Sequence, residues 1–251
     1  MDLGIKYKTA LVTGGAKGIG AAITRALMAE GVKVIFTSRD QEAIFKMEAE
    51  PALFRPKGIL VNEHADLLRG DVDGVDILVN NAGATLGVMD PFAPIEDYRR
   101  VMALNFELAV QLSNRYIPRM KKSRWGRIVN IASLAGLENR GPVAYCCSKA
   151  ALVAYTRSMG RILAIEAPSI VMSAILPGVV ATEGGHWDTG STEEHKAAYL
   201  ARESPLKRFG RPEEIAPAVA FYCSQLASFS HGAIVPVDAG LSKGFMAHNY
   251  L

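Results

Sequence analysis

The sequence predicts an α/β protein with one doubly wound domain over residues 1–251, built on a mainly parallel seven-stranded sheet with helices on both faces. The chain has 251 residues, 49% of them hydrophobic, which is enough for one large domain with a full core or for two small ones. Short apolar runs alternate with stretches of helical periodicity, as is typical of parallel sheets with right-handed crossovers. No repeat, low-complexity tract or linker divides the chain, and this favours a single domain.

The seven expected strands are short apolar runs, and several are continuous enough for burial on both faces of a sheet. In chain order they cover residues 9–13, 33–38, 58–61, 75–83, 127–133, 171–178 and 233–240. Pro236 weakens the hydrogen-bond ladder of the last strand, because proline has no backbone N–H. Helical periodicity predicts helices between most of these strands, at residues 19–31, 95–122, 144–166 and 212–226.

The segment 40–74 has the least regular pattern. Its first part, QEAIFKMEAEPALFRP, predicts a helix that ends near Pro51. Its last part, HADLLRGDVDG, leaves room only for a turn or a short helical piece before the fourth strand.

The composition argues against several functional classes. The 28 lysines and arginines exceed the 25 aspartates and glutamates by only three charges, too few to suggest a nucleic-acid partner. The basic cluster within residues 121–127 is interpreted as a solvated helix end in preference to a docking patch for an acidic partner. The three cysteines do not suggest a disulfide framework, and we see neither a signal peptide nor a membrane-spanning apolar run. We therefore expect a soluble cytoplasmic protein with no membrane contact.

The stretch TGGAKGIG, residues 13–20, lies between the first expected strand and the first expected helix. In this context Gly14, Gly18 and Gly20 let the backbone turn tightly and approach a pyrophosphate. The helix that follows would offer its unpaired N–H groups and its positive end to the phosphates. An ordinary glycine-rich turn is the alternative, but the position after the first strand favours a nucleotide.

The end of the second expected strand indicates which nucleotide. NAD-binding sheets typically end this strand with an acidic residue that binds the ribose hydroxyls. Here the strand ends in Thr37, Ser38 and Arg39, and Lys17 lies inside the glycine turn. Two cations without a carboxylate at this place favour a 2′-phosphate, and hence NADP(H). The nearest acid is Asp40, which could instead neutralise Arg39.

Further motifs occur in order on the expected elements, and together they make the chain resemble the short-chain dehydrogenase/reductase family over nearly its full length. They are TGGAKGIG, NNAG (80–83), Asn105 in ALNFELA, Ser133 in NIAS, Tyr145 and Lys149 as Y-x-x-x-K, PGVVAT (177–182), and GRPEEIA followed by VDAG. The stretch MKKSRWGRIVNIAS is similar to the 3-oxoacyl-carrier-protein reductase branch. The resemblance implies a Rossmann fold with seven parallel strands, a nicotinamide cofactor, and a homo-oligomer, either a tetramer or a dimer.

The resemblance also implies which residues act. The family's catalytic tetrad corresponds to Asn105, Ser133, Tyr145 and Lys149, in which Asn105 would position a water between Lys149 and solvent. Asp66 resembles the acid that contacts the adenine, although it could equally be a plain loop aspartate. The complete set of expected cofactor-binding residues is Gly14, Lys17, Gly18, Ile19, Gly20, Ser38, Arg39, Asp66, Asn81, Ala82, Gly83, Tyr145, Lys149, Pro177, Gly178, Val180 and Thr182.

The stretch AYCCSKAAL raises the question whether sulfur takes part in the chemistry. Tyr145 and Lys149 are four residues apart, so on a helix they share a face, whereas Cys146 and Cys147 point elsewhere. Adjacent cysteines suit neither a disulfide nor a metal site, and we expect no metal here; packing in the core or at a subunit interface is the better interpretation. A free phenol has a pKa of about 10, and a nearby ammonium favours its phenolate form. Tyr145 is therefore the expected general acid and base, and Ser133 the partner of the substrate oxygen.

The substrate is less defined. Before the sixth strand Val171 stands where relatives usually have arginine, which weakens the case for an acyl-carrier substrate. Residues 183–209 correspond to the substrate lid, in which His186, Trp187, Tyr199 and Arg202 could line a polar pocket, or the aromatic residues could anchor the lid. The first functional hypothesis is an NADPH-dependent carbonyl reductase or alcohol dehydrogenase, with a 3-oxoacyl-thioester reductase as a specific form. The alternatives are a nucleotide-binding regulator without turnover and, more weakly, a sugar-nucleotide epimerase.

Overall fold

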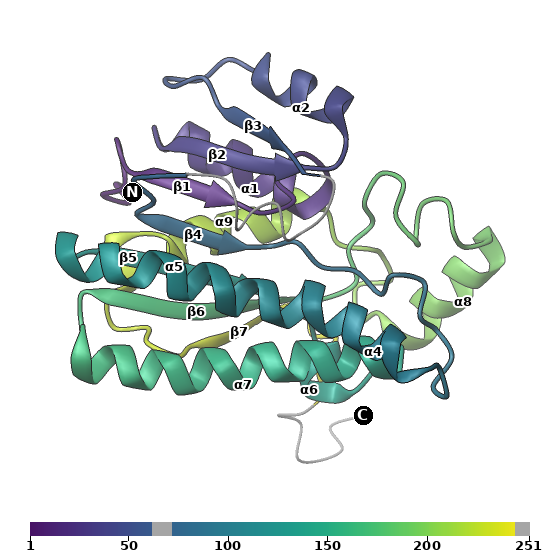
Figure 1. Cartoon of the computed structure of the whole chain (residues 1–251). Coiled ribbons are helices and arrows are strands. Elements are labelled where there is room, and N and C mark those ends of the chain that lie inside the picture. The colour runs from purple at the N-terminus through teal and green to yellow at the C-terminus, as the bar shows by residue number, and fades with distance from the viewer. Residues whose placement is uncertain (62–71, 244–251) are drawn as a thin grey trace.

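Seven strands form one sheet in the computed structural model, which describes residues 1–61 and 72–243 (Figure 1). The strands are β1 (Thr9–Val12), β2 (Lys33–Ser38), β3 (Lys57–Leu60), β4 (Ile77–Asn80), β5 (Gly126–Ile131), β6 (Ile170–Pro177) and β7 (Ile234–Val237). Their order in the sheet is β3-β2-β1-β4-β5-β6-β7, and every neighbouring pair is parallel. The predicted fold class is therefore confirmed.

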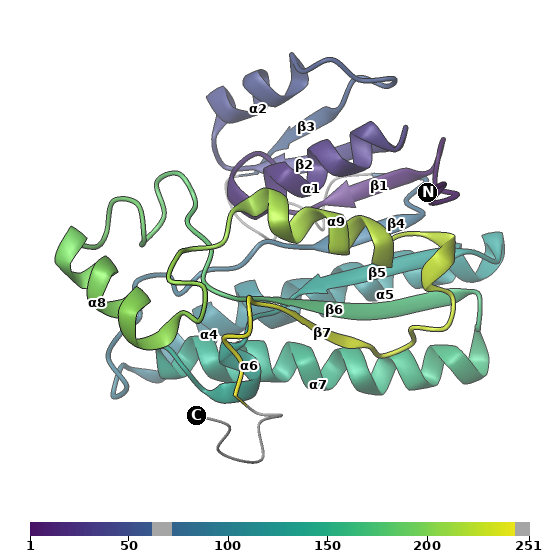
Figure 2. The same ribbon diagram turned by 180° about the vertical axis from the view of Figure 1, so that it is seen from behind.

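Helices cover both faces of the sheet. The helices are α1 (Gly18–Ala29), α2 (Gln41–Glu48), α4 (Ile95–Met102), α5 (Leu108–Ser123), α6 (Ala135–Glu138), α7 (Val143–Glu166), α8 (Glu193–Glu203) and α9 (Pro212–Tyr222). Figure 1 shows α4, α5 and α7 in front of the sheet, and Figure 2 shows α1 and α9 on the opposite face. Apolar side chains of α1, α2 and α9 pack in one core cluster, and those of α5 and α7 contribute to another on the opposite face.

The central strands are buried on both sides, which explains why they read as continuous apolar runs. All side chains of β4, β5 and β6 are buried, whereas those of the edge strand β7 are half-buried. The chain runs outward from β1 in both directions, to β2 on one side and to β4 on the other. Such a reversal opens a crevice at the carboxyl ends of the strands, and this is where parallel sheets bind ligands.

Several predicted elements differ in extent from those observed; the strand expected at 233–240, for example, covers only Ile234–Val237. The single helix expected at 95–122 is α4, a π-helical turn at Ala103–Glu107, and α5. The strand expected at 75–83 ends at Asn80, because the backbone N–H groups of the next two residues bond to the Thr13 side chain instead of continuing the ladder. The helix expected at 212–226 ends at Tyr222 and is followed by a 3₁₀ turn. The short helix α6 was not predicted, since four residues carry too little periodicity.

Candidate active site

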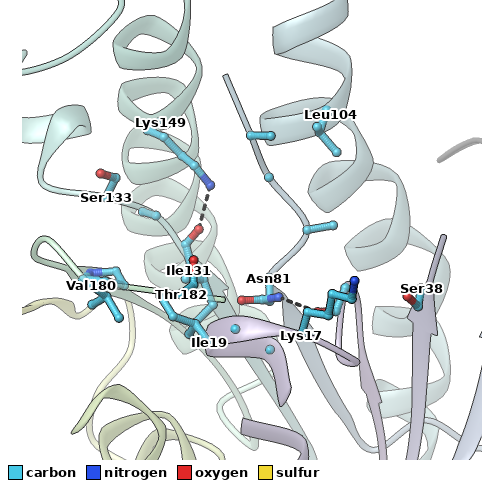
Figure 3. Close-up of a pocket in the computed structure, with 18 of the residues that line it drawn as sticks. Lys17, Ile19, Ser38, Asn81, Leu104, Ile131, Ser133, Lys149, Val180 and Thr182 are labelled. Carbon is cyan, nitrogen blue, oxygen red and sulfur yellow. Dashed lines mark hydrogen bonds between the residues drawn. The ribbon is translucent and has the colours of Figure 1, made fainter. Parts of the chain in front are cut away.

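A cleft of about 640 Å³ runs along the carboxyl ends of the central strands (Figure 3). Ser133 and Lys149 lie toward one end of this cleft, and Lys17 and Ser38 toward the other. The structure brings most of the expected site residues to its lining: Gly14, Lys17, Gly18, Ile19, Gly20, Ser38, Arg39, Asn81, Ala82, Gly83, Ser133, Tyr145, Lys149, Pro177, Gly178, Val180 and Thr182. Asn105 lies behind Gly83, and Asp66 falls outside the described residues.

The glycine turn has the conformation of a phosphate-binding loop. Gly14 and Gly18 have backbone φ angles of +64° and +52°, which residues other than glycine rarely adopt. A Cβ atom on Gly20 would lie 2.1 Å from the Gly14 carbonyl oxygen, so only glycine fits there. Helix α1 begins at Gly18 without a side-chain cap and without an acidic residue in its first turn. Its first N–H groups and its positive end are thus left for an anion.

Two threonines that sequence reasoning missed hold this loop in place. The Thr13 hydroxyl accepts hydrogen bonds from the backbone N–H groups of Asn81 and Ala82, both at 2.9 Å. The Thr37 hydroxyl accepts one from the Gly14 N–H at 3.0 Å. Both threonines are buried and lie at the ends of apolar strands. A polar residue at the end of an apolar run was the feature of the sequence that could have indicated their role. The loop, β2 and the segment after β4 therefore form one connected support.

Charged side chains mark the Lys17 end of the cleft. Lys17 Nζ lies 2.5 Å from an Asp40 carboxylate oxygen, while Arg39 is exposed and has no ion-pair partner among the described residues. The alternative pairing of Asp40 with Arg39 is thus wrong, since Asp40 pairs with Lys17. The hydrogen bond from Lys17, together with that from the Ala43 N–H, holds the pKa of Asp40 below its usual range.

Lys149 lies at the other end, buried in α7. Its ammonium donates a hydrogen bond of 2.8 Å to the Ile131 carbonyl and lies 5.7 Å from the centre of the Tyr145 ring. Burial lowers the pKa of Lys149 from 10.5 to about 8, because the charged form loses its hydration. Lys149 therefore remains largely protonated at neutral pH.

The pKa of Tyr145 moves in the direction opposite to the one expected from its lysine neighbour. Burial raises it, and a hydrogen bond with Ser133 opposes the rise only in part. The loss of hydration of the phenolate outweighs the favourable neighbours within the chain. The chain alone thus keeps Tyr145 protonated.

Asn105 lies in the π-helical turn between α4 and α5, a distortion that is frequent at functional sites. Its amide donates to the carbonyls of Ala84 and Val101 at 2.8 and 2.9 Å, and its oxygen accepts from the Ala84 N–H at 3.1 Å. A Cβ atom on Gly83 would lie 2.6 Å from this oxygen and 2.9 Å from Lys149 Nζ. The missing side chain of Gly83 thus leaves room for both Asn105 and Lys149 beside the cleft.

The expected lid contains α8 and an aromatic cluster around Trp187. The Trp187 ring lies 4.5 Å from that of Tyr199 and 5.0 Å from that of Phe209 (centre to centre). Trp187 also lines the cleft, whereas Tyr199 lines a separate cavity of about 250 Å³ and the exposed Arg202 pairs with its neighbour Glu203. His186 packs against Trp187 outside the cleft lining. Of the four lid residues, only Trp187 lines the cleft itself, while Tyr199 lines the neighbouring cavity.

The cysteines are free and lie away from the cleft lining. Cys146 is buried, and burial raises its thiol pKa, while Cys147 is exposed on the outer side of α7. Among residues 1–61 and 72–243, no three histidine, cysteine or acidic side chains are grouped as metal ligands. No helix in this described part of the chain is long and apolar enough to cross a membrane.

The chain is similar in sequence to known proteins over most of its length. The family model for short chain dehydrogenases matches residues 8–189. The chain is 34% identical to the 3-oxoacyl-[acyl-carrier-protein] reductase FabG of Aquifex aeolicus, over 96% of this chain and all of that reductase. It is also 34% identical to FabG of Haemophilus influenzae, over 93% of this chain and 98% of that protein.

A solved structure has the same fold throughout. The L-sorbose reductase of Gluconobacter frateurii, complexed with NADPH and L-sorbose, superposes with a TM-score of 0.86 at 27% identity, over 97% of this chain and 99% of the reductase chain. The region matched by the family model contains both the glycine loop and the pair Tyr145 and Lys149. The chain therefore belongs to the short-chain dehydrogenase family of oxidoreductases.

Proposed function

We propose that this protein is an NADP(H)-dependent oxidoreductase that transfers a hydride between the nicotinamide cofactor and a carbonyl or alcohol substrate. The observation that carries this proposal is that the glycine loop and the groups Ser133, Tyr145 and Lys149 line one continuous cleft. The L-sorbose reductase with the same fold is described as complexed with NADPH. A purely nucleotide-binding regulator would have no need for a buried lysine beside a half-buried tyrosine.

The residues of the cleft fit the cofactor. The tight turn that Gly14, Gly18 and Gly20 allow at the start of α1 suits the pyrophosphate, and Asn81, Ala82 and Gly83 would support the ribose side. Lys17, Ser38 and Arg39 would bind the 2′-phosphate. When bound, the cofactor supplies or accepts the hydride. Near the nicotinamide we place Pro177, Gly178, Val180 and Thr182, and we keep Asp66 as the proposed adenine contact.

The chain's own groups supply the proton chemistry. Tyr145 is protonated because burial raises its pKa, so it can donate a proton to a carbonyl oxygen that is being reduced. Ser133 would hydrogen-bond the same oxygen and stabilise its developing charge. Lys149 and the positive charge of an oxidised nicotinamide would favour the phenolate in the reverse direction. Asn105 would position a water between Lys149 and solvent.

Two substrate classes have specific support. Full-length relatives named 3-oxoacyl-[acyl-carrier-protein] reductase favour a 3-oxoacyl thioester, whereas the fold neighbour complexed with L-sorbose favours a keto-sugar. Val171 is buried in β6, so this position offers no cation to an acidic carrier protein. We therefore propose a small carbonyl compound as the general class, with the thioester as the second candidate.

We also propose a cytoplasmic homo-oligomer, either a tetramer or a dimer. The free thiols of Cys146, Cys147 and Cys223 suit a reducing compartment. Exposed apolar side chains on α7 provide a surface for a second copy.

Replacement of Tyr145 by phenylalanine tests the proposed chemistry. Tyr145→Phe removes the hydroxyl and keeps the ring, so NADPH binding measured by titration calorimetry should stay nearly unchanged. Turnover should fall by about 10²–10⁴-fold, the usual contribution of a positioned acid. NADPH oxidation should be followed with 3-oxoacyl thioesters, keto-sugars, diketones and cyclic ketones as substrates. Retention of most of the activity by this variant would remove Tyr145 from the mechanism.

A further inference from the structure

The ion pair between Lys17 and Asp40 occupies the end of the cleft where the 2′-phosphate is proposed to bind. Asp40 Oδ2 lies 2.5 Å from Lys17 Nζ, and both residues line the cleft beside Ser38 and Arg39. The Ser38 hydroxyl accepts a hydrogen bond of 3.0 Å from the Asp40 N–H, which fixes the backbone at this point. A carboxylate thus holds one of the two cations that we assign to the phosphate.

The two oxygens of Asp40 have different tasks. Oδ1 caps helix α2 by accepting a hydrogen bond of 3.0 Å from the Ala43 N–H, while Oδ2 holds Lys17. A cap needs only a side-chain oxygen, and asparagine or serine caps about as well as aspartate. Capping of α2 therefore explains why a side-chain oxygen is present at this position, but it does not explain the negative charge. That charge faces Lys17 in the cleft.

We propose that Asp40 is a specificity-determining residue whose carboxylate competes with the 2′-phosphate of NADP(H) for Lys17 and thereby narrows the preference for NADP(H) over NAD(H). A phosphate that reaches Lys17 displaces this carboxylate from its cation and then lies close to a like charge. NAD(H) has no 2′-phosphate, so its binding is insensitive to the competition. This inference rests on the proposed function, because it assumes that the cleft binds a dinucleotide.

The inference is tested by a variant that removes the negative charge of Asp40 but keeps a side-chain oxygen to cap α2. Asp40→Asn should increase the affinity for NADPH and for adenosine 2′,5′-bisphosphate by about 5–30-fold. This is the effect expected when one negative charge is removed from beside a bound phosphate in a partly solvated site. NADH affinity should not change. The gain for NADPH should shrink as salt is added, since the contacts are exposed to solvent. All affinities are measured by titration calorimetry.

Glu42 provides a matched control on the same helix turn. Its carboxylate pairs with Lys46 at 2.7 Å and does not contact Lys17, so Glu42→Gln should alter neither NADPH nor NADH binding. Asp40→Ser, which also retains a capping oxygen, should reproduce the gain if Asp40→Asn folds poorly.

The outcomes separate this inference from the function on which it rests. NADPH binding that is unchanged or weaker in the Asp40 variants, with the unmodified protein binding NADPH well, would overturn the role of Asp40 alone. An equal gain for NADPH and NADH would also overturn it. Failure of the unmodified protein to bind either dinucleotide would overturn both.

Discussion

At the scale of single residues, burial determines how the groups of the cleft ionise. Lys149 is 2% exposed and donates a hydrogen bond to a neutral carbonyl, and the same loss of hydration raises the pKa of Tyr145. Asp40, by contrast, is partly exposed and is kept ionised by its hydrogen bonds. The cleft therefore combines a protonated acid at one end with an ion pair at the other.

The buried ammonium of Lys149 should make stability depend on pH. Its pKa falls from 10.5 to about 8 on folding, so the unfolded chain holds this proton more tightly than the folded chain between these values. The resulting cost to folding, on the order of 3 kcal/mol, is complete below about pH 8 and disappears as the pH rises through 10.5. The Ile131 carbonyl, unpaired once the lysine is replaced, reduces the gain from such a replacement.

Lys149→Met should therefore gain stability relative to the unmodified protein at neutral pH, and this gain should narrow above about pH 8. Urea unfolding of both proteins across this range measures the difference. Lys121→Met serves as the control, because Lys121 is exposed and its loss should give no such trend. A difference that does not vary with pH would show that Lys149 is not charged at a cost in the folded state.

At the scale of elements, the glycine loop and the start of α1 define the phosphate end of the cleft. Asn81 donates to the carbonyls of Thr13 and Gly14 at 2.9 and 3.2 Å, and so ties the loop to the segment after β4. Gly20 lies on the inner side of this turn, against the backbone of Gly14. A side chain at position 20 would collide with backbone atoms of Gly14, which cannot move aside as a flexible side chain could.

Gly20→Ala should disrupt this element. The added methyl group would lie 2.1 Å from the Gly14 oxygen, so the loop must move and the phosphate contacts must be lost. We expect dinucleotide affinity to fall by at least about tenfold, as for the loss of one charge-assisted hydrogen bond, together with a lower melting temperature. Gly210→Ala is the control, since its Cβ would meet Val180 at an ordinary 3.4 Å. Unchanged affinity in Gly20→Ala would contradict the proposed phosphate loop.

At the scale of the whole molecule, α5, α7 and α9 pack against strands of the sheet, and the sides of the helices that face away from it decide where a second copy could bind. Most apolar side chains of α4, the π-helical turn and α5 do not contribute to an exposed surface. Val101, Leu104 and Leu112, for example, are buried within the chain. The outer side of α7 is different, because Ile162 and Ile165 are 43% and 72% exposed. Figure 1 shows α7 on the outside of the molecule, where a second copy can reach it.

This surface leads to a prediction about assembly. Sedimentation should show a dimer or tetramer at micromolar concentration, because association removes Ile162 and Ile165 from water. Replacing both by glutamate should produce smaller species. Phe45→Glu, on the exposed side of α2, should leave the assembly unchanged. A stable monomer of the unmodified protein at this concentration would rule the assembly out.

The sequence by itself determined the order of the elements, the glycine loop and the pair Tyr145 and Lys149, because these depend on local periodicity and on spacing along one helix. It also determined the family, through motifs that follow one another in a fixed order. Only the tertiary structure decided that Asp40 pairs with Lys17, that Thr13 and Thr37 hold the loop, and that Tyr199 lies outside the cleft lining. Contacts between distant segments and the loss of hydration on burial decide these points, and both arise only when the chain is packed.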